Sequence, residues 1–387
     1  MKRRFPSFSQ WKQIFKVLKK RERITLVVFF LLALGSFIFL VSNFYVSYTK
    51  AAPSFGGTYT EGILGQPRFI NPIYGETNEV DRTLMNLVFS GLMTYDQEGK
   101  IVPDLAESYT VSNDGRTYDF QLKEQTIWHD GKVLTADDVV FTVRAIQNSD
   151  YKSPLRANWI DITVEKLSDK AVRFTLKTPY NSFLENCTFK IAPRHIWDGI
   201  SPENAILSSF NLKPVGSGPF QFKNIAQNNA GFIQELELES NRRYYRKPSY
   251  IANLNIHFFE TREDLAKAIN AKNIDGFNLS SLDHDDVSVD KLIKQKYYNA
   301  VNLPLPRYFA VFFNNGKSSI FSSTDIRKAM ISSVNTDELI SKVNTDFKEA
   351  NIARVDSPIL PDFFGYQTSL AVSGFDQDQA KTLLDKA

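Results

Sequence analysis

The sequence predicts an α/β fold that follows one membrane-spanning segment. Three features support this prediction: an apolar run near the N-terminus, pairs of alternating runs joined by short turns, and helical patterns that begin with capping residues. The strand and helix patterns are interleaved along a chain of 387 residues, which is long enough for two or more domains with large cores. We therefore expect a mixed α/β body of more than one domain.

The apolar run near the N-terminus covers Ile24–Val41, eighteen residues interrupted only by Thr25, Gly35 and Ser36. At ~1.5 Å per residue, a helix of this length spans a hydrocarbon core of roughly 30 Å. Lysine and arginine are concentrated just before it, and by the positive-inside rule this places the N-terminus in the cytoplasm. We expect a basic cytoplasmic tail (1–23), a transmembrane signal-anchor helix (24–46) and a linker (47–57).

Two fates are open for this helix. A cleaved secretory signal has a shorter apolar core and ends in a small-residue cleavage site. Here the core is long and no such site lies near its end, although Lys50-Ala51-Ala52 offers a later cleavage point. We favour an uncleaved anchor. The protein would then be a single-pass protein of the cell membrane, with its body extracytoplasmic, in the periplasm or on the outer face.

Charge and residue usage exclude several classes of function. Residues 1–23 hold nine Lys or Arg and one Glu and carry +8, so the remainder carries −5 to give the total of +3. The basic character belongs to the tail, and we expect no nucleic-acid partner. Cys187 is the single cysteine, which excludes an intramolecular disulfide, and we expect it to be a small buried apolar residue. Without a catalytic or metal-ligand motif, we expect no enzyme activity, no cofactor and no metal site.

The stretch 103–144 contains the clearest secondary-structure signals. Asn113-Asp114-Gly115 separates two alternating runs and predicts a hairpin whose buried face carries Tyr118, Phe120 and Leu122. His129-Asp130-Gly131 predicts a second reversal. Thr135 and Asp138 then have the spacing of a capping box, and Val139, Val140, Val143 and Ile146 follow at helical spacing. We expect this stretch to be scaffold.

Similar patterns predict the other elements of the body. The glycines of Pro214–Phe220 are expected to take φ values that other residues avoid, and the absence of a following Lys-Ser/Thr argues against a phosphate loop. The remaining expectations are a strand at 58–63, a helix at 80–95 ending at Gly91-Leu92, a hairpin at 162–176, a strand at 254–258, a capped helix from Thr261 and a buried strand at 308–315.

Several segments, in order, carry a family resemblance. They are PDLAESY from Pro103, WHDGKVLTADDVVFTV from Trp128, PVGSGPF from Pro214 and DIRKAM from Asp325. Together they resemble the signatures of family 5 extracytoplasmic solute-binding proteins, the peptide, oligopeptide and nickel receptors of ABC importers. The resemblance extends from about Gly56 to Ala387.

The resemblance implies a periplasmic-binding-protein-like fold with two lobes and an extra subdomain on lobe I. Residues 58–100 and 205–305 would form lobe I, 101–204 the extra subdomain, and 306–387 the start of lobe II. Members of the family continue beyond the last of these segments. The resemblance therefore also implies that the second lobe is truncated in this chain.

The resemblance further implies a receptor that captures peptides or oligopeptides between its lobes and delivers them to the permease subunits of an ABC importer. Nickel, haem or a sugar as the ligand, and a sensor that works without an importer, remain alternatives. The candidate ligand-binding residues lie in a loop at the mouth of the cleft and in the strand that crosses between lobes: Phe69, Ile70, Asn71, Tyr74, Tyr308, Phe312 and Asn314.

Overall fold

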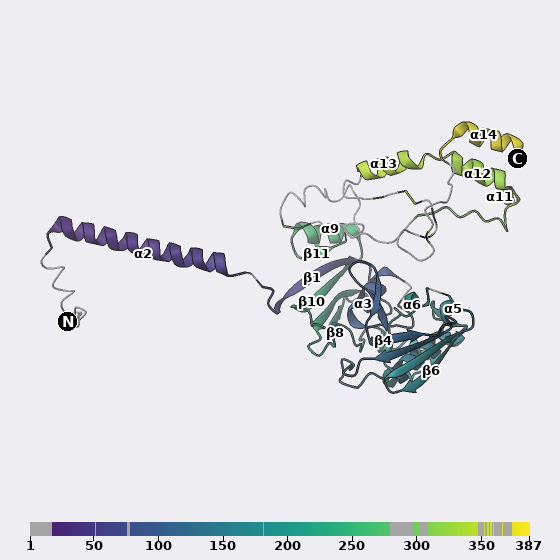
Figure 1. Ribbon diagram of the computed structural model, residues 1–387, viewed down its shortest axis with the longest axis horizontal. Coiled ribbons are helices and arrows are strands. Elements are labelled where there is room, and N and C mark those ends of the chain that lie inside the picture. Colours follow the sequence, from purple (N-terminus) through teal and green to yellow (C-terminus); the bar gives the residue numbers. More distant parts are fainter. Residues whose placement is uncertain are drawn as a thin grey trace. The chain divides into compact units, whose positions relative to one another are not determined.

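The computed structural model describes residues 18–50, 52–75, 78–180, 182–278, 297–299, 301, 309–346, 352, 354–355, 357, 359, 366 and 374–387 (Figure 1). The chain divides into two compact units, residues 1–55 and residues 56–387. We call the second unit the body, and we describe each unit by itself.

The N-terminal unit contains helix α2, Lys20–Tyr48, which has 29 residues and buries none of them. The predicted apolar helix is therefore confirmed, and it extends beyond both predicted ends. Its first turn is closed by Glu22, whose carboxylate accepts a hydrogen bond from the backbone N–H of Lys19 at 2.8 Å. Among the described residues it is the single helix long and apolar enough to cross a membrane.

A five-stranded mixed sheet forms one part of the body, with the order β11-β1-β10-β9-β8. Strand β1 runs parallel to β10 and β11, whereas β8, β9 and β10 are antiparallel neighbours. Helix α9 packs on the β1–β10 side of this sheet, as Figure 1 shows. The bounds are β1 Gly56–Leu64, β8 Phe220–Gln227, β9 Ile233–Ser240, β10 Ile251–Phe259, β11 Gly276–Phe277, α3 Glu79–Val88 and α9 Arg262–Asn270.

A four-stranded antiparallel sheet forms a second part, with the order β4-β5-β7-β6. Both predicted hairpins are confirmed in it, and Gly115 takes φ +67° in the first turn. Alternate side chains of β5 and β7 face a core in which the rings of Phe120 and Phe174 meet edge to face at 5.6 Å. The bounds are β4 Ala106–Val111, β5 Thr117–Leu122, β6 Ile162–Ser168 and β7 Ala171–Leu176.

Helix α4, Ala136–Gln147, packs on this second sheet through β6 and β7. The predicted capping box is present, because the Thr135 N–H donates to Asp138 at 2.9 Å and the Thr135 side chain accepts from the third helical N–H. The four aliphatic residues predicted at helical spacing are all buried. Cys187 is also fully buried, as predicted, and burial raises the pKa of its thiol.

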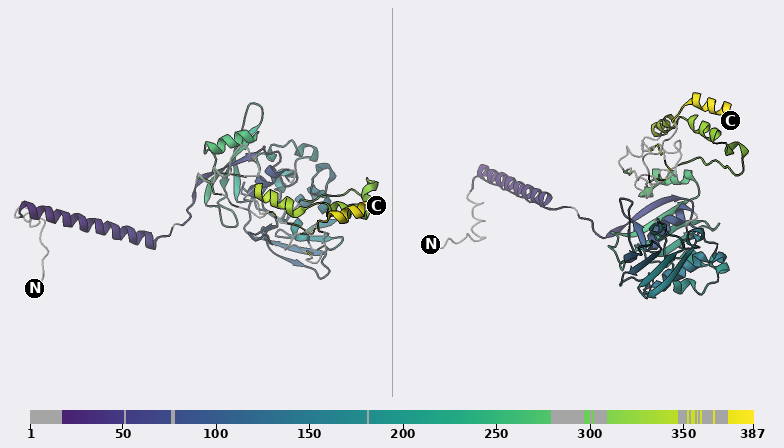
Figure 2. Two further views of the ribbon diagram at one scale, coloured as in Figure 1. Left: turned by 90° about the horizontal axis from the view of Figure 1, so that it is seen from above. Right: turned by 45° about the vertical axis from the view of Figure 1, so that its right-hand side comes forward.

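Short elements connect the two sheets, and four helices are found among the described residues after 318. Figures 1 and 2 show α12 and α14 side by side, and the N–H of Asp376 donates to the carbonyl of Ser332 at 2.8 Å. The bounds are β2 Met93–Tyr95, β3 Ile101–Pro103, η1 Ser149–Tyr151, α5 Arg156–Trp159, α6 Phe183–Asn186, α7 Arg194–Trp197, α8 Pro202–Ala205, η2 Ser209–Asn211, α11 Ser319–Ser322, α12 Thr324–Ser332, α13 Thr336–Asp346 and α14 Gln377–Lys386.

Two predicted elements are wrong. The helix expected to continue to Gly91 ends at Val88, because Phe89 is extended (φ −117°, ψ 160°) and 93–95 pair with 101–103 as strands. The buried strand expected at 308–315 is not found over 309–315, where Phe309 is 99% exposed. Apolar residues form a buried strand only where neighbours supply hydrogen bonds and cover, and no described strand pairs with this segment. Tyr308 lies outside the described residues.

The glycines of the Pro214–Phe220 turn do not serve the purpose predicted for them. Neither Gly216 nor Gly218 has a positive φ. A Cβ at Gly216 would instead lie 1.9 Å from the carbonyl oxygen of Val88, and the N–H of Gly218 donates to that oxygen at 2.8 Å. Close approach of two backbone segments, rather than an unusual φ, is what excludes a side chain here.

The same turn is bonded to the predicted reversal at His129. The N–H of Gly216 donates to His129 Nδ1 at 3.1 Å, and His129 Nε2 lies 3.1 Å from the carbonyl oxygen of Gly218. Burial lowers the pKa of His129 to about 4, so the ring is neutral at pH 7. A neutral ring that accepts at Nδ1 carries its proton on Nε2, which then donates to Gly218.

Substitution of Gly216 tests this close approach. Gly216→Ala forces a methyl group onto a backbone carbonyl that ends α3, and we expect the thermal unfolding midpoint of the body to fall by at least about 5 °C. Gly199→Ala is the matched control, because nothing lies within 4 Å of its added Cβ. Equal midpoints for the two variants, measured by circular dichroism, would contradict the proposed contact.

Candidate functional site

The loop between β1 and α3 contains four of the predicted ligand-binding residues, and the structure brings these four together. Ile70 and Asn71 are completely buried and Tyr74 is 5% exposed, while Phe69 is half-buried. The predicted mouth-of-cleft loop is therefore packed into the body at three of its four candidate positions.

Asn71 is the polar centre of this loop. Its side-chain oxygen accepts from the N–H of Ile73 at 2.9 Å, and its amide donates to the side-chain oxygen of Asn211 at 2.9 Å. The N–H of Gly75 donates to the Asn71 carbonyl at 2.7 Å, and the N–H of Ile70 donates to the Asn211 carbonyl at 2.8 Å. The Asn71 side chain is thus engaged within the protein, and we expect it to shape the loop.

Asp81 holds the start of the loop and was not singled out from the sequence. It is completely buried in the first turn of α3 and accepts from the N–H of Arg68 at 2.7 Å and from the amide of Asn78 at 2.6 Å. Burial raises the pKa of Asp81, and hydrogen bonds from the backbone of Arg68 and Phe69 oppose that rise. The spacing of Asn78 and Asp81, typical of a helix N-cap, was the signal that could have identified it.

The C-terminal part of the loop contacts Tyr151 and Ser153, which lie between α4 and α5 in the chain. Ser153 donates its hydroxyl to the carbonyl of Ile73 at 2.7 Å. The Tyr74 ring lies 5.4 Å from the Phe69 ring and 6.5 Å from the Tyr151 ring, measured between centroids. Burial and the neighbouring Tyr151 raise the pKa of Tyr74 to about 12, and its hydroxyl has no hydrogen-bond partner among the described residues.

Over residues 67–75, the loop offers little side-chain surface to a ligand. Within this range Arg68 is exposed and Phe69 is half-buried, and the other residues are buried. Arg68 was not among the predicted site residues, and a single charged residue in a loop carries no sequence signal that distinguishes it. A segment with few exposed side chains suits recognition of a ligand by backbone groups.

The second group of predicted site residues lies in 308–315. Phe312 is 84% exposed, and the side-chain oxygen of Asn314 accepts from the N–H of Lys317 at 3.1 Å. Both side chains therefore face solvent, and Tyr308 lies outside the described residues.

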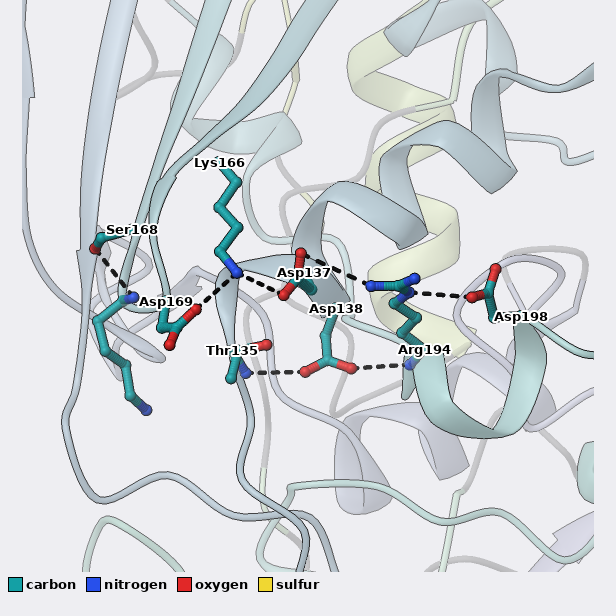
Figure 3. Close-up of polar contacts among 9 residues, drawn as sticks. Thr135, Asp137, Asp138, Lys166, Ser168, Asp169, Arg194 and Asp198 are labelled. Carbon is teal, nitrogen blue, oxygen red and sulfur yellow. Dashed lines mark hydrogen bonds and ion pairs between the residues drawn. The ribbon is translucent and has the colours of Figure 1, made fainter.

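A second polar cluster lies between α4 and α7 (Figure 3). Asp138 is 4% exposed and accepts from the N–H groups of Thr135 and Arg194 at 2.9 and 2.8 Å. Burial raises the pKa of Asp138, and these hydrogen bonds oppose the rise. The cluster joins the two helices and has the character of a structural link. No group of three or more possible metal ligands occurs in the part of the chain that the structure describes.

Comparisons with known proteins place this geometry in context. The model of the bacterial extracellular solute-binding proteins, family 5 Middle, matches residues 100–387. Oligopeptide-binding protein AppA of Bacillus subtilis is 27% identical over 373 residues, which are 94% of this chain and 66% of that protein. The chain thus spans slightly less than two thirds of this relative.

Solved structures agree in fold. The structure of Bacillus subtilis AppA with a nonapeptide has a TM-score of 0.66 at 26% identity, covering 87% of this chain and 64% of that one. CtaP of Listeria monocytogenes has a TM-score of 0.69 at 27% identity, covering 86% and 65%. NikZ of Campylobacter jejuni, in complex with Ni(L-His), has a TM-score of 0.65 at 25% identity, covering 85% and 62%.

The role of Asp81 in holding the loop can be tested by a nearly isosteric change. In Asp81→Asn, one carboxylate oxygen becomes an amide group, which cannot accept the hydrogen bond that the Asn78 amide donates. If the Asn78 side chain rotated to compensate, its oxygen would no longer cap α3. We expect a loss of roughly 1–3 kcal/mol of stability. Because Arg68 is exposed and its N–H bonds to Asp81, we also expect faster trypsin cleavage after Arg68.

Asp385→Asn is the matched control, because Asp385 is exposed near the end of α14. Cleavage would be followed by mass spectrometry of the native protein. If both variants are cleaved after Arg68 at the wild-type rate, Asp81 does not hold the loop.

Proposed function

The chain belongs to the bacterial extracellular solute-binding proteins of family 5, and on this premise we propose that it captures peptides for an ABC importer. The observation that carries the proposal is the agreement in fold with AppA in complex with a nonapeptide. The sequence match to AppA over 94% of the chain supports it. The permease subunits of the importer would be the partners that receive the peptide.

We propose the division of the body that the sequence suggested. Residues 58–100 and 205–305 would form lobe I around the five-stranded sheet, and 101–204 would form the extra subdomain around the four-stranded sheet. Residues 306–387 would belong to lobe II. The peptide would lie between lobes I and II, and closure of the lobes would shield it from water.

In the proposed peptide site, buried residues would shape the loop, and more accessible residues would contact the ligand. Ile70, Asn71 and Tyr74 would fix the shape of the loop, because their side chains are buried. Phe69 would present a ring to the ligand. Across the cleft, the exposed Phe312 and Asn314 would contribute contacts, together with Tyr308. Main-chain hydrogen bonding would tolerate many side chains and so allow peptides of mixed sequence.

Nickel is the second candidate ligand, favoured by the fold agreement with NikZ in complex with Ni(L-His). The described residues contain no group of metal ligands, which weakens this candidate for the part of the chain that the structure covers. Haem, a sugar, and a sensor role without an importer have no comparable support.

We further propose that α2 is retained as a membrane anchor. Its 29 residues exceed the roughly 20 needed to cross a bilayer, and a basic segment precedes it. On fractionation of cells that express the protein, we expect the full-length chain to remain in the membrane pellet after alkaline carbonate washing. A soluble form that begins near Ala52 would show instead that the helix is removed.

Native mass spectrometry of the full chain in lipid nanodiscs, purified without denaturation, tests the peptide proposal. We expect co-purified peptides of mixed mass, which should be displaced by added peptide. Phe312→Ala should reduce the peptide-bound fraction several-fold, while Phe309→Ala, three residues away and 99% exposed, is the matched control. Nickel or a single non-peptide ligand in place of peptides would refute the proposal.

A further inference from the structure

We propose that a cavity between α4 and α7 is a separate binding site for a small organic carboxylate with an apolar body. The cavity has a volume of about 340 Å³. One face of α4 lines it from Asp137 onward, together with Asn148, which follows the helix. Arg194 of α7, Asp198 just after α7, and Tyr151 of η1 also line it. The proposal does not depend on a ligand between the lobes.

The charges at one end of the cavity are already paired. Asp137 lies 2.7 Å from Lys166 and 3.8 Å from Arg194, and Arg194 Nε lies 3.1 Å from Asp198 (Figure 3). Both carboxylates that line the cavity therefore have cationic partners, and Arg194 has anionic ones. A charged ligand would have to displace these ion pairs, so this end does not determine the ligand.

Arg144 carries the positive charge that remains. Its guanidinium makes no hydrogen bond or ion pair with any residue that the structure describes. Asn148, one helical turn further on the same face, uses its side-chain oxygen to accept from the N–H of Asp150 at 3.0 Å, which leaves its amide group as a donor. A guanidinium beside an amide donor matches the two oxygens of a carboxylate.

Three residues of α4 form an apolar patch between these two ends. Val140 and Ala145 are buried, and Phe141 lies beside them on the same face of α4. The ring of Tyr151, which is 8% exposed, also lines the cavity, and its centroid lies 6.5 Å from that of the Tyr74 ring. An apolar patch beside one group of free donors suits a ligand that has a hydrocarbon body and one anionic end. A phenyl ring with a short acid side chain is well within the volume.

Fluorine NMR on the full chain in nanodiscs provides the test. The probes are 4-fluorophenylacetate, its neutral amide and the cation 4-fluorophenethylamine. We expect the carboxylate to bind, and Arg144→Gln to weaken it roughly threefold, because Arg144 is exposed and an exposed ion pair contributes little. Arg116→Gln is the matched control, because Arg116 is exposed at the tip of the β4–β5 hairpin.

The control also corrects for probe that partitions into lipid, since both variants share the same nanodisc. Tighter binding of the carboxylate to the wild type and to Arg116→Gln than to Arg144→Gln supports the site. Equal signals for all three proteins would overturn it, as would binding of the amine or the amide as strongly as the carboxylate. Added peptide should leave the signal unchanged if this site is separate from the proposed interlobe site.

Discussion

The backbone contact at the carbonyl of Val88 is the constraint on which the arrangement of the body depends. This oxygen terminates α3, accepts the N–H of Gly218, and leaves no space for a side chain at Gly216. Gly216 and Gly218 of this turn form hydrogen bonds with the two ring nitrogens of His129, which precedes α4 in the chain. One carbonyl therefore connects the five-stranded sheet, the helix that supports the ligand loop, and the part of the body built on the four-stranded sheet.

The sequence was informative wherever local chemistry determines local structure. Alternating runs predicted both hairpins correctly, with a turn glycine in the first, and a capping box predicted α4, because each of these signals is local in the sequence. The errors arose where distant segments decide. Near the end of the helix after Asn78, Gly91 forms a β-bridge with Lys190, which is about a hundred residues further along the chain. The purpose of Gly216 depends on Val88, which is more than a hundred residues away.

The candidate site was less predictable than the fold. Its location in the loop after β1 came from the family resemblance, and the comparisons confirm that family. Which side chains are accessible was not predictable, because burial of Ile70 and Asn71 depends on Asn211 and on the neighbouring aromatic rings. Asp81 was missed for a related reason: its N-cap spacing indicates a helix start, whereas its bond to the Arg68 N–H is visible only in three dimensions.

The isolation of Cys187 has a practical consequence for measuring motion. The chain has no other thiol, and this one is completely buried, with burial raising its pKa and so suppressing the reactive thiolate. A cysteine introduced at an exposed position, such as Phe312, would therefore be the dominant target of a maleimide dye or spin label in the folded protein. Distances across the proposed cleft thus become accessible to spectroscopy without first engineering a cysteine-free background.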